Sequence, residues 1–578
     1  MAFTDLRVYS NCDYATIVWR TDTSIKNCRG FALERQVSGA TGDAVDGFVN
    51  TYVGFAGQKP GKAAVQPSTI WPIQRYIWSD YAVSQGQKVR YRVVPMLRNT
   101  ANGPLVKAAQ SAWSDWSDWA SVVTEQTPGF GAYFNRGIVP AQFLAKQLQQ
   151  TGSFKTMLTK DISTPGSANR AFLSGVMRVE ILALLDKAKR DGINIYGALY
   201  ELNDPELKDR LIALGQNCSL ILGSGAYKPG VPDENAAARK ELKGKIQLFD
   251  RLVTSPHFAH NKFLVFCDAD GNPSSVWTGS MNWTMTGLCT QVNNAVHIKS
   301  TDLATGYKKR WDALVKAKSA YPATLAEAGS QPTKATLGKV DITGWQDPCL
   351  KYANLNDAAK YIQNAKEGVL FLMFNPGTGD GKTKAYSLLQ DIQNLDPDSL
   401  FIRGVLNQDQ SSAKDPMVSL TNGSKTAEAG VDLITPHALT STVKNWFHRE
   451  FQYNMVMIHS KVVVVDPFGK NPVVMTGSDN MGPKASKSND DNLVIIENAP
   501  GLAAEYAVNI MGVYGHYKWL YNAWKKASDA QPPVKKGQKK PPVPVEPHYD
   551  GNEDDDKWQA FYTSGVNKQE IDFWLGKP

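Results

Sequence analysis

Residues 257–284 read "HFAHNKFLVFCDADGNPSSVWTGSMNWT", and a similar stretch, "MIHSKVVVVDPFGKNPVVMTGSDNMG", occurs at residues 457–482. Each stretch contains His, one residue, Lys, an apolar run, and then Gly-Ser-x-Asn. Structure alone gives no reason to repeat the whole set. The repetition therefore indicates a duplicated unit that brings two copies of one chemical set together.

The apolar runs "KFLVF" and "KVVVVD" each predict a β-strand. Side chains two residues apart on a strand point to the same side of a sheet, so His260 and Lys262 should share one face. His459 and Lys461 should do the same in the second copy. Each copy would thus present one nucleophile or acid and one phosphate-binding cation together.

A second apolar strand in each copy ends in Thr-Gly-Ser-x-Asn. Ser280 and Asn282 lie two residues apart, as do Ser478 and Asn480, so their hydroxyl and amide donors should point toward one ligand. Two cations, two imidazoles and several donors suit a tetrahedral phosphate, whose oxygens accept several hydrogen bonds.

The pattern HxKx4D followed by GSxN, present twice, resembles the phospholipase D superfamily, also called the HKD family, and its two-motif bacterial members. "SNDDNLVII", after the second GSxN, is also similar to bacterial members, and the resemblance covers roughly residues 126–528. It implies an α/β fold in which two duplicated α/β/α halves are related by a pseudo-twofold axis. It also implies one active site at the interface of the halves.

The resemblance implies a role for each motif residue. His260 would attack phosphorus and form a phosphohistidine, while His459 would protonate the leaving oxygen and later activate water. The non-bridging oxygens would be bound by Lys262, Lys461, Asn282 and Asn480.

Family members commonly place an acid thirteen residues after the motif Ser, where it holds the far nitrogen of the imidazole. That count reaches Asp491 in the second copy and Asn293 in the first. The expected pairs are therefore Asp491 with His459 and Asn293 with His260. An imidazole held by an amide should stay neutral and nucleophilic near pH 7, but the asymmetry could also reverse the roles of the two His. Tyrosyl-DNA phosphodiesterases, in the same superfamily, also tolerate an amide on one side.

The ends of the two motif strands differ. The first copy has Cys267 at the motif's Asp position and Asp268 one residue late, which predicts a bulge or a shifted strand end. In the second copy Asp466 occupies the motif position and is predicted to hold the following turn. No His/Asp/Glu cluster suggests a metal site, and because the lysines supply positive charge we expect neither metal nor cofactor.

Residues 1–125 consist of short β segments separated by Gly, Asn, Asp and Pro, which predicts an antiparallel β-sandwich. Trp19, Tyr91 and the run "WSDWSDW" at residues 113–119 resemble features of a fibronectin type III domain. For the Trp run we predict a stacked Trp/cation ladder on a strand. The alternative is that this domain binds an unknown protein or glycan.

The rest of the chain divides by pattern. Residues 126–330 and 331–528 each alternate helices with strands and each contain one motif, which predicts two α/β halves. Residues 529–557 are rich in Pro and charge and predict an extended linker. Residues 558–578 regain aromatics and predict a segment that docks on the body.

Charge and composition limit the partners and the location. A formal net charge of +8 favours anionic partners: phosphodiesters, nucleic acid or an acidic membrane surface. The absence of a signal-peptide pattern and of an apolar run of membrane-spanning length predicts a soluble protein, cytoplasmic or exported by a signal-independent route. One chain carries both halves, so a monomer should suffice. The six cysteines predict free thiols, with a disulfide between Cys12 and Cys28 as the open alternative.

Three functions are compatible with this sequence. The first is a hydrolase of phospholipid phosphodiesters, as most proteins with two complete motifs are. The second is a nuclease or nucleic-acid end-processing phosphodiesterase, which the charge favours slightly. The third is a non-catalytic scaffold, which the intact His and Lys of both copies argue against. Residues 443–457, "VKNWFHREFQYNMVM", supply both aromatics for lipid and cations for nucleic acid, and do not decide.

Overall fold

The chain divides into two compact units. The first consists of Met1–Gln126, Ala504–Gly512 and Pro547–Pro578, and the second of Thr127–Ala503 and Val513–Glu546. The computed structural model describes residues 3–39, 42–56, 58, 65–100, 103–137, 154–226, 233–377, 387–396, 399–407, 431–434, 443–445, 457–529, 543–545 and 551–576.

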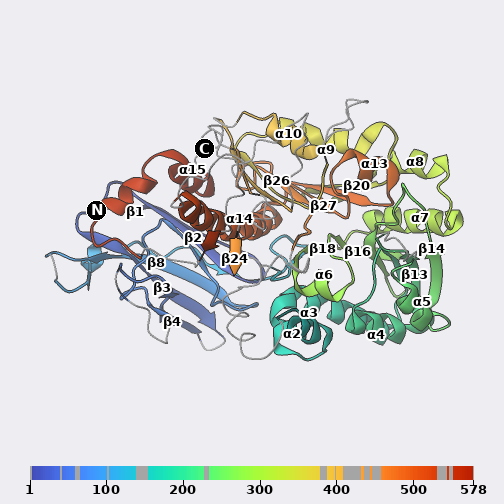
Figure 1. Cartoon of the computed structure of the whole chain (residues 1–578), viewed down its shortest axis with the longest axis horizontal. Helices are drawn as coiled ribbons and strands as arrows, with labels where there is room; N and C mark the ends of the chain where they lie inside the picture. Colours follow the sequence, from blue (N-terminus) through green and yellow to red (C-terminus); the bar gives the residue numbers. More distant parts are fainter. Residues whose placement is uncertain are drawn as a thin grey trace. The chain divides into compact units, whose positions relative to one another are not determined.

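Antiparallel sheets dominate the first unit (Figure 1). Trp19 and Tyr91 lie fully buried in its core, and Cys12 and Cys28 are buried free thiols, so the alternative disulfide is absent. One sheet has the order β1 (Phe3–Ser10), β2 (Ala15–Thr21), β7 (Ile77–Asp80). The other has the order β10 (Ala120–Ser121), β8 (Lys88–Leu97), β3 (Cys28–Gly39), β4 (Gly42–Phe48), with β9 (Val106–Lys107) also paired to β8, while β5 (Asn50–Thr51) pairs with β6 (Gln66–Pro67).

The Trp run beside β8 forms the predicted cation ladder. The guanidinium of Arg90 lies 5.4 and 4.6 Å from the ring centroids of Trp116 and Trp119, and that of Arg92 lies 4.6 and 4.7 Å from those of Trp113 and Trp116. The run is not a strand, as it was predicted to be. Ser114 and Ser117 donate their backbone N–H groups to the Val93 and Tyr91 carbonyls of β8, so the run follows β8 and its three-residue repeat places each Trp beside an arginine.

The C-terminal residues belong to the first unit. They form a 3₁₀ helix, η6 (Lys557–Tyr562), and α15 (Gly565–Trp574). The buried Gln559 side chain accepts a hydrogen bond from the backbone N–H of Ile25 at 2.8 Å and donates one to its carbonyl at 3.0 Å. This segment is therefore held by specific hydrogen bonds within the unit.

The first half of the second unit is built on a seven-stranded mixed sheet. Its order is β11 (Phe130–Phe134), β18 (Asn294–Ile298), β16 (Pro273–Gly279), β15 (Lys262–Cys267), β12 (Ile195–Leu199), β13 (Cys218–Gly223), β14 (Gln247–Arg251). Its helices are α2 (Phe154–Ser163), α3 (Ala168–Asp191), α4 (Pro205–Ala213), α5 (Ala236–Leu242), α6 (Met285–Cys289), α7 (Thr301–Ala317) and α8 (Ala323–Gly329).

The second half repeats the strand order position by position. Its sheet runs β20 (Val340–Gln346), β28 (Asn492–Glu497), β27 (Val473–Gly477), β26 (Val462–Val465), β21 (Gly368–Met373), β22 (Phe401–Leu406), β23 (Val431–Ile434), with β19 (Thr333–Leu337) beyond β20. In each sheet the last three strands are parallel to one another and antiparallel to the motif strand. The predicted α/β fold with duplicated halves is confirmed.

The second half has fewer described helices than the first. They are α9 (Ala353–Gln363), α10 (Leu388–Gln393), α13 (Pro483–Ser488) and the part of α14 (Pro500–Asp529) that lies outside Ala504–Gly512. Two further strand pairs are β17 (Gln291–Val292) with β25 (Met457–Ile458) and β24 (Val443–Asn445) with β29 (Val543–Val545). Across the described part of the chain, no helix combines the length and the apolar character that a membrane span requires.

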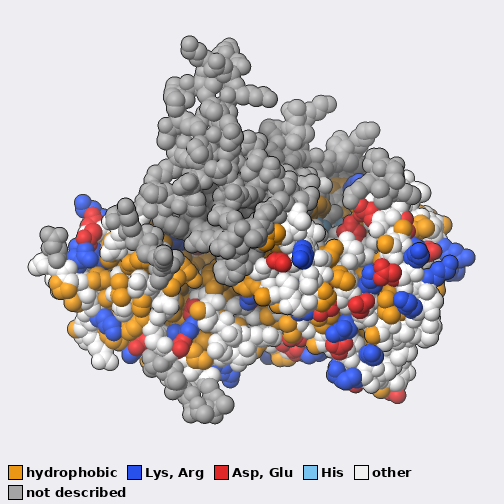
Figure 2. Space-filling view, turned by 60° about the horizontal axis from the view of Figure 1, so that its bottom comes forward, with side chains coloured by type: hydrophobic (Ala, Val, Ile, Leu, Met, Phe, Trp, Pro, Cys, Tyr) orange, Lys and Arg blue, Asp and Glu red, His pale blue; other side chains and the backbone are white. Residues whose placement is uncertain are grey.

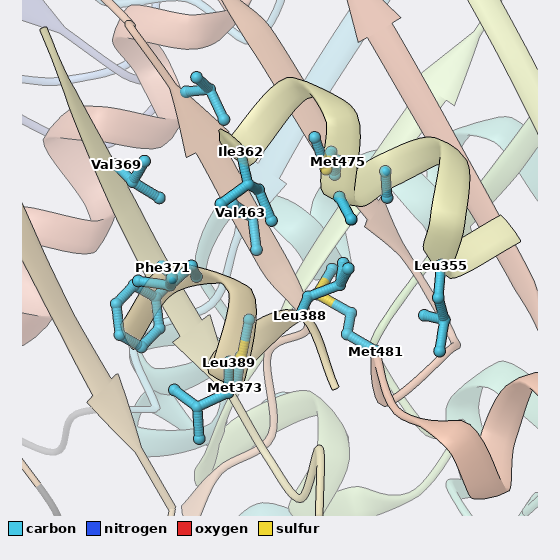
Figure 3. Packing of buried hydrophobic residues seen from close by; sticks show 14 of the residues in the cluster. Leu355, Ile362, Val369, Phe371, Met373, Leu388, Leu389, Val463, Met475 and Met481 are labelled. Atoms are coloured by element: carbon cyan, nitrogen blue, oxygen red, sulfur yellow. The ribbon is translucent and has the colours of Figure 1, made fainter. Parts of the chain in front are cut away.

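A tight apolar core supports the second motif strand. In Figure 3, Ile362 of α9 and Leu388 of α10 pack with Phe371 of β21 and Val463 of β26. All four residues of β26 are buried, so both faces of the strand are covered. A strand covered on both faces is apolar throughout, which explains the uninterrupted Val run.

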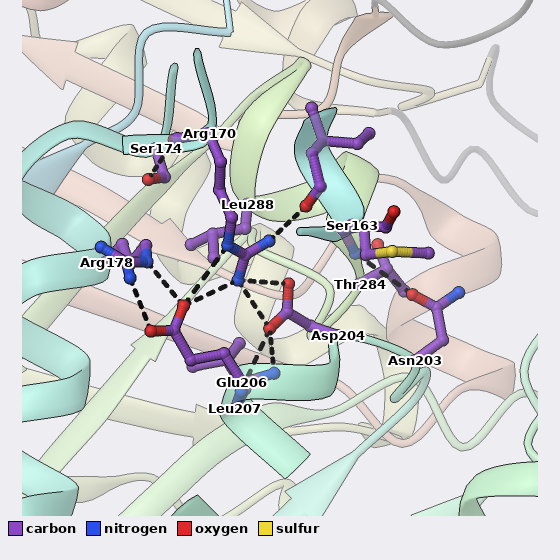
Figure 4. Close-up of polar contacts among 12 residues, drawn as sticks. Ser163, Arg170, Ser174, Arg178, Asn203, Asp204, Glu206, Leu207, Thr284 and Leu288 are labelled. Carbon is purple, nitrogen blue, oxygen red and sulfur yellow. Dashed lines mark hydrogen bonds and ion pairs between the residues drawn. The ribbon is translucent and has the colours of Figure 1, made fainter. Parts of the chain in front are cut away.

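A buried ion network fixes the loop that follows β12. The guanidinium of Arg170 on α3 lies between Asp204 and Glu206 of α4, and Arg178 also binds Glu206 (Figure 4). Arg170 and Asp204 have fully buried side chains and lie 2.9 Å apart. The backbone N–H of Asp204 donates to the carbonyl of Trp283, which ties this loop to the first GSxN segment.

Candidate active site

The four motif side chains with titratable nitrogen are buried together at the ends of β15 and β26. His260 and Lys262 are 7% and 2% exposed, and His459 and Lys461 are 4% and 0% exposed. Each Lys donates from Nζ to the backbone carbonyl of its own His at 2.7 Å. The two copies therefore have the same local geometry.

The imidazoles are held by residues of the opposite half. The Nδ1 atom of His260 lies 2.7 Å from Asp491 Oδ1, and that of His459 lies 2.9 Å from Asn293 Oδ1. The predicted pairing within each copy is wrong. Its physical cause is the parallel pairing of β17 with β25, in which the His459 N–H donates to the Val292 carbonyl and brings the next residue beside the imidazole.

These partners fix the tautomer of each neutral imidazole. The Asn293 amide donates from Nδ2 to the Gly287 carbonyl at 2.8 Å, which leaves its Oδ1 as an acceptor facing His459. An ionised Asp491 can only accept, so Nδ1 carries the proton in His260 as well. The Nε2 lone pair of each ring is then available for phosphorus or for a proton.

The motif serines hold these partners. The hydroxyl of Ser280 donates to Asn293 Oδ1 at 2.8 Å, and that of Ser478 donates to Asp491 Oδ1 at 2.7 Å. Each hydroxyl also accepts a backbone N–H. A hydroxyl has one proton, so neither serine can also donate to a phosphate, and their predicted substrate contact is corrected to a positioning contact.

The motif asparagines keep unused acceptors. The Oδ1 atoms of Asn282 and Asn480 are buried and have no hydrogen-bond partner among the described residues. Asn282 donates from Nδ2 to Glu201 Oε2 at 2.8 Å, and its second N–H remains for a ligand. The sequence interpretation missed Glu201, whose only signal is its place two residues after β12.

Two aromatic rings that the sequence interpretation also missed cover the imidazoles. Tyr200 directly follows β12 and lies 4.6 Å from the His260 ring, and Phe374 directly follows β21 and lies 4.9 Å from the His459 ring. The motif Lys of each half lies 5.0 Å from the centroid of the same aromatic ring. An aromatic residue at the end of the equivalent strand in both halves could have revealed the pair.

Burial dominates the electrostatics of the four groups. It lowers the pKa of His260 to about 4, although Asp491 opposes this decrease. Burial, followed by the two lysines and His260, lowers the pKa of His459 well below its usual value. Burial lowers the pKa of Lys262 to about 8 and that of Lys461 well below 10.5. Both imidazoles are therefore neutral near pH 7 until an anion enters.

The residues that end the motif strands are structural. A register shift occurs between Phe266 and Cys267, as predicted, and the Asp268 carboxylate accepts N–H groups of the following turn. The Asp466 carboxylate instead accepts the N–H groups of residues 366–368, at the start of β21, while in the turn that follows it the Gly469 N–H binds the Asp466 backbone carbonyl. The antiparallel pairing of β26 with β21 brings the end of one strand to the start of the other.

This arrangement surrounds one position with two imidazoles, two ammonium groups and two amides. It suits a phosphate that accepts charge-assisted hydrogen bonds while one Nε2 attacks and the other exchanges a proton. Within the described ranges, no group of three His, Cys, Asp or Glu side chains could hold a metal ion.

Comparisons with solved structures give remote likenesses. Phosphatidylserine synthase from Haemophilus influenzae Rd KW20 is 14% identical over 58% of this chain and 83% of its own, with a TM-score of 0.38. Nuc from Salmonella typhimurium, a phospholipase D family member, is 17% identical over 31% of this chain and 96% of its own, at 0.21. Yeast tyrosyl-DNA phosphodiesterase is 9% identical over 54% and 84%, at 0.29. No curated protein sequence matches the chain.

A family model is more informative than these structures. The model described as "Cardiolipin synthase, PLD-like domain" matches residues 181–315 and 359–511, one segment in each half. Each segment contains one complete His-Lys and Gly-Ser-x-Asn set. The chain belongs to the phospholipase D superfamily of phosphodiesterases and phosphotransferases.

Proposed function

We propose that this chain hydrolyses phospholipid phosphodiester bonds through a phosphohistidine intermediate. The observation that carries the proposal is the crossed holding of the two imidazoles, His260 by Asp491 and His459 by Asn293. It leaves both Nε2 atoms available in one buried, cationic site. Such a site supplies a nucleophile and an acid without further reorganisation.

In the first step the Nε2 lone pair of His260 attacks phosphorus. The bond from phosphorus to the leaving oxygen breaks, and that oxygen takes the Nε2 proton of His459. Lys262 and Lys461 offset the negative charge on the non-bridging oxygens, while the Asn282 amide donates its second N–H. The bound phosphate anion favours the protonated form of His459 that this step requires.

In the second step a water molecule attacks the phosphohistidine. His459, now neutral, takes one proton from the water as the new oxygen–phosphorus bond forms. The phosphorus–nitrogen bond breaks, which returns the lone pair to His260 and releases a phosphomonoester. Both imidazoles then return to their starting protonation states, so the cycle closes.

The contact with Asp491, in place of the amide expected from the sequence, favours His260 as the nucleophile. A phosphorylated imidazole that keeps its Nδ1–H is cationic, and the adjacent Asp491 carboxylate stabilises that cation. His459 faces the neutral Asn293 amide, which stabilises its imidazolium less and makes it the stronger proton donor. The Asp491 carboxylate thus stabilises the phosphohistidine on His260, and the Asn293 amide leaves His459 a stronger acid.

We favour phospholipid over nucleic acid as the substrate class, for two reasons. The matching family model carries the description of a cardiolipin synthase domain, a lipid enzyme. On the face shown in Figure 2, Lys and Arg side chains are interspersed with Asp and Glu over the described surface, whereas a nuclease benefits from a basic groove. Residues 446–456, which supply aromatics and cations, lie outside the described residues.

Purified protein should be assayed on phosphatidylcholine, phosphatidylethanolamine, cardiolipin, and single- and double-stranded DNA. We expect release of a phosphomonoester from at least one lipid, and no release from His260→Ala. Cleavage of DNA alone would transfer the same mechanism to nucleic acid. Absence of cleavage of every substrate, in protein with a normal melting transition, would overturn the proposal.

A further inference from the structure

The first half has a carboxylate beside the phosphate position that the second half lacks. Glu201 follows Tyr200 after β12, and the equivalent position after Phe374 and β21 is Asn375. The strands are equivalent because they have the same place in the two sheets, and the two rings cover the two catalytic imidazoles in the same way. The halves thus differ by one negative charge at matched positions.

Glu201 is held in place by backbone and side chain. Its carbonyl accepts the backbone N–H of Trp283 at 3.2 Å, and its carboxylate accepts the Nδ2 N–H of Asn282 at 2.8 Å. The buried ion network of Arg170 and Asp204 anchors the same loop a few residues later. The carboxylate is therefore fixed next to an amide of the active site.

The field of Glu201 reaches both motif lysines. Burial lowers the pKa of Lys262 to about 8, and the carboxylates of Asp491 and Glu201 oppose that decrease. Glu201 opposes the decrease at Lys461 as well, after burial and Lys262 have lowered it. A charge that acts on both lysines also acts on a phosphate bound between them.

We infer that Glu201 is a specificity-determining residue that admits a singly charged phosphodiester and rejects a doubly charged phosphomonoester. This inference rests on the proposed function, because it assumes that a phosphodiester is bound by Lys262 and Lys461. A phosphomonoester carries between one and a half and two negative charges at neutral pH, and a diester carries one. The same repulsion by Glu201 would promote release of the phosphomonoester product.

The size of the effect follows from Coulomb's law. At a separation on the order of 10 Å and an effective dielectric constant of about 20, one added charge changes affinity about tenfold. Replacing Glu201 by Gln keeps an acceptor for Asn282 and removes the charge. A purely structural role would weaken the binding of every anion, whereas the inference expects a gain for the dianion.

The test measures binding of inorganic phosphate and of diethyl phosphate by calorimetry at pH 7.5. In Glu201→Gln we expect the affinity for phosphate, relative to diethyl phosphate, to rise about tenfold. Glu201→Asp should keep the wild-type ratio. Lys262→Met should lose both anions, which locates the binding. An unchanged ratio in folded Glu201→Gln would overturn the inference.

A second variant covers the case in which Glu201→Gln does not fold. Asn375 is exposed, so Asn375→Glu should be tolerated and should lower the relative affinity for phosphate, with Asn375→Gln as control. An unchanged ratio there would also overturn the inference. Lipid turnover by the wild-type protein is measured separately. If the wild-type protein turns over lipid but the variants leave the affinity ratio unchanged, only the inference about Glu201 is overturned. If the ratio changes but no lipid is turned over, only the proposed function is overturned.

Discussion

The two halves share a strand order and a His-Lys-Ser-Asn set, but they differ in charge beneath the site. Asn135, directly after β11, donates its backbone N–H to the backbone carbonyl of Asn293, and Asp347, directly after β20, donates its own to the backbone carbonyl of Asp491. The two halves therefore share this backbone geometry but not the charge of the side chains at these positions. At three equivalent buried positions the first half has Asn135, Met281 and Asn293, and the second has Asp347, Asp479 and Asp491.

In the second half, the neighbouring carboxyl groups of Asp347 and Asp479 share one proton. Burial raises the pKa of Asp347 to about 7, and Asp347 and Asp479 are hydrogen-bonded to each other. Asn354 donates to the Asp479 carboxyl at 2.8 Å. Two contacting carboxyls cannot both ionise readily, so one stays protonated. The crossed pairs therefore give the two imidazoles different partners: His260 faces the Asp491 carboxylate of the acidic half, and His459 faces the Asn293 amide.

The largest expected effect separates the two imidazoles directly. His260→Ala should lower turnover by about 10⁴-fold or more, because no nucleophile remains. His459→Ala should also be inactive on phospholipid, but with a leaving group that needs no protonation it should form phosphoenzyme on His260. Trapping with labelled substrate and locating the label by mass spectrometry measures this.

The matched control for that comparison is His257→Ala. His257 binds the Ser488 carbonyl and stacks on Tyr321, and neither contact involves a catalytic imidazole or the residue that holds it, so its removal should leave the labelling intact. Label on His459 in the wild-type protein would reverse the assignment of roles. It would leave the phosphodiesterase proposal in place.

The next largest effect is expected from Asp491→Asn, which gives both imidazoles an amide partner. Asp491→Asn should lower kcat by about 10²- to 10³-fold, less than the loss of about 10⁴ when an amide imposes the wrong tautomer on a catalytic imidazole. The loss is smaller because Asn293 already shows that an amide can present its oxygen to Nδ1. Asp312→Asn, on the exposed side of α7, is the control. Unchanged kcat in Asp491→Asn would mean that the carboxylate does not stabilise the intermediate.

A smaller effect concerns pH. The pKa of Lys262 is lowered to about 8, so its charged form is lost as the pH rises through that value, and kcat/KM should fall there in the wild-type protein. Lys262→Arg keeps its charge at higher pH and should move this limb upward, with a lower absolute rate. Steady-state kinetics between pH 6 and 10 would measure both. A limb that does not move would assign the titration to another group.

Local sequence patterns were enough to predict the strands, and to predict that His and Lys share one face in each motif. The short β segments predicted within residues 1–125 include β8 (Lys88–Leu97), and the apolar run "KFLVF" predicted as a strand lies in β15. These features depend on neighbours in sequence. The His-Lys faces depend only on the two-residue period of a strand.

The pairings across the site could not be predicted in the same way. Asn293 and His459 are 166 residues apart, and Asn282 and Glu201 are 81 apart, so both contacts depend on how distant segments pack. The thirteen-residue spacing identified Asp491 and its counterpart but not the ring each would hold. The spacing is local, whereas the choice of ring follows from the pairing of β17 with β25.

The smallest expected change at neutral pH comes from Asn293→Asp. A carboxylate beside His459 favours its protonated form and raises its pKa from the lowered value, so the acid should keep its proton to higher pH and the alkaline limb of kcat should shift upward by about one unit. Near pH 7 we expect only a few-fold change in rate. The lost donor to the Gly287 carbonyl should cost about 1–3 kcal/mol of stability, measurable as a lower Tm.

Combining Asn293→Asp with Asp491→Asn exchanges the two partners and asks whether charge or position selects the nucleophile. If the carboxylate selects it, label from a trapped intermediate should move from His260 to His459, because the cationic phosphohistidine is then stabilised on the other ring. If position selects it, label stays on His260 at a reduced rate. We expect label on both rings. The exchange moves only one carboxylate, and the carboxyl groups of Asp347 and Asp479 remain in the second half. Label confined to His260 would show that the shape of the site, and not the asymmetry of charge between the halves, divides the two roles.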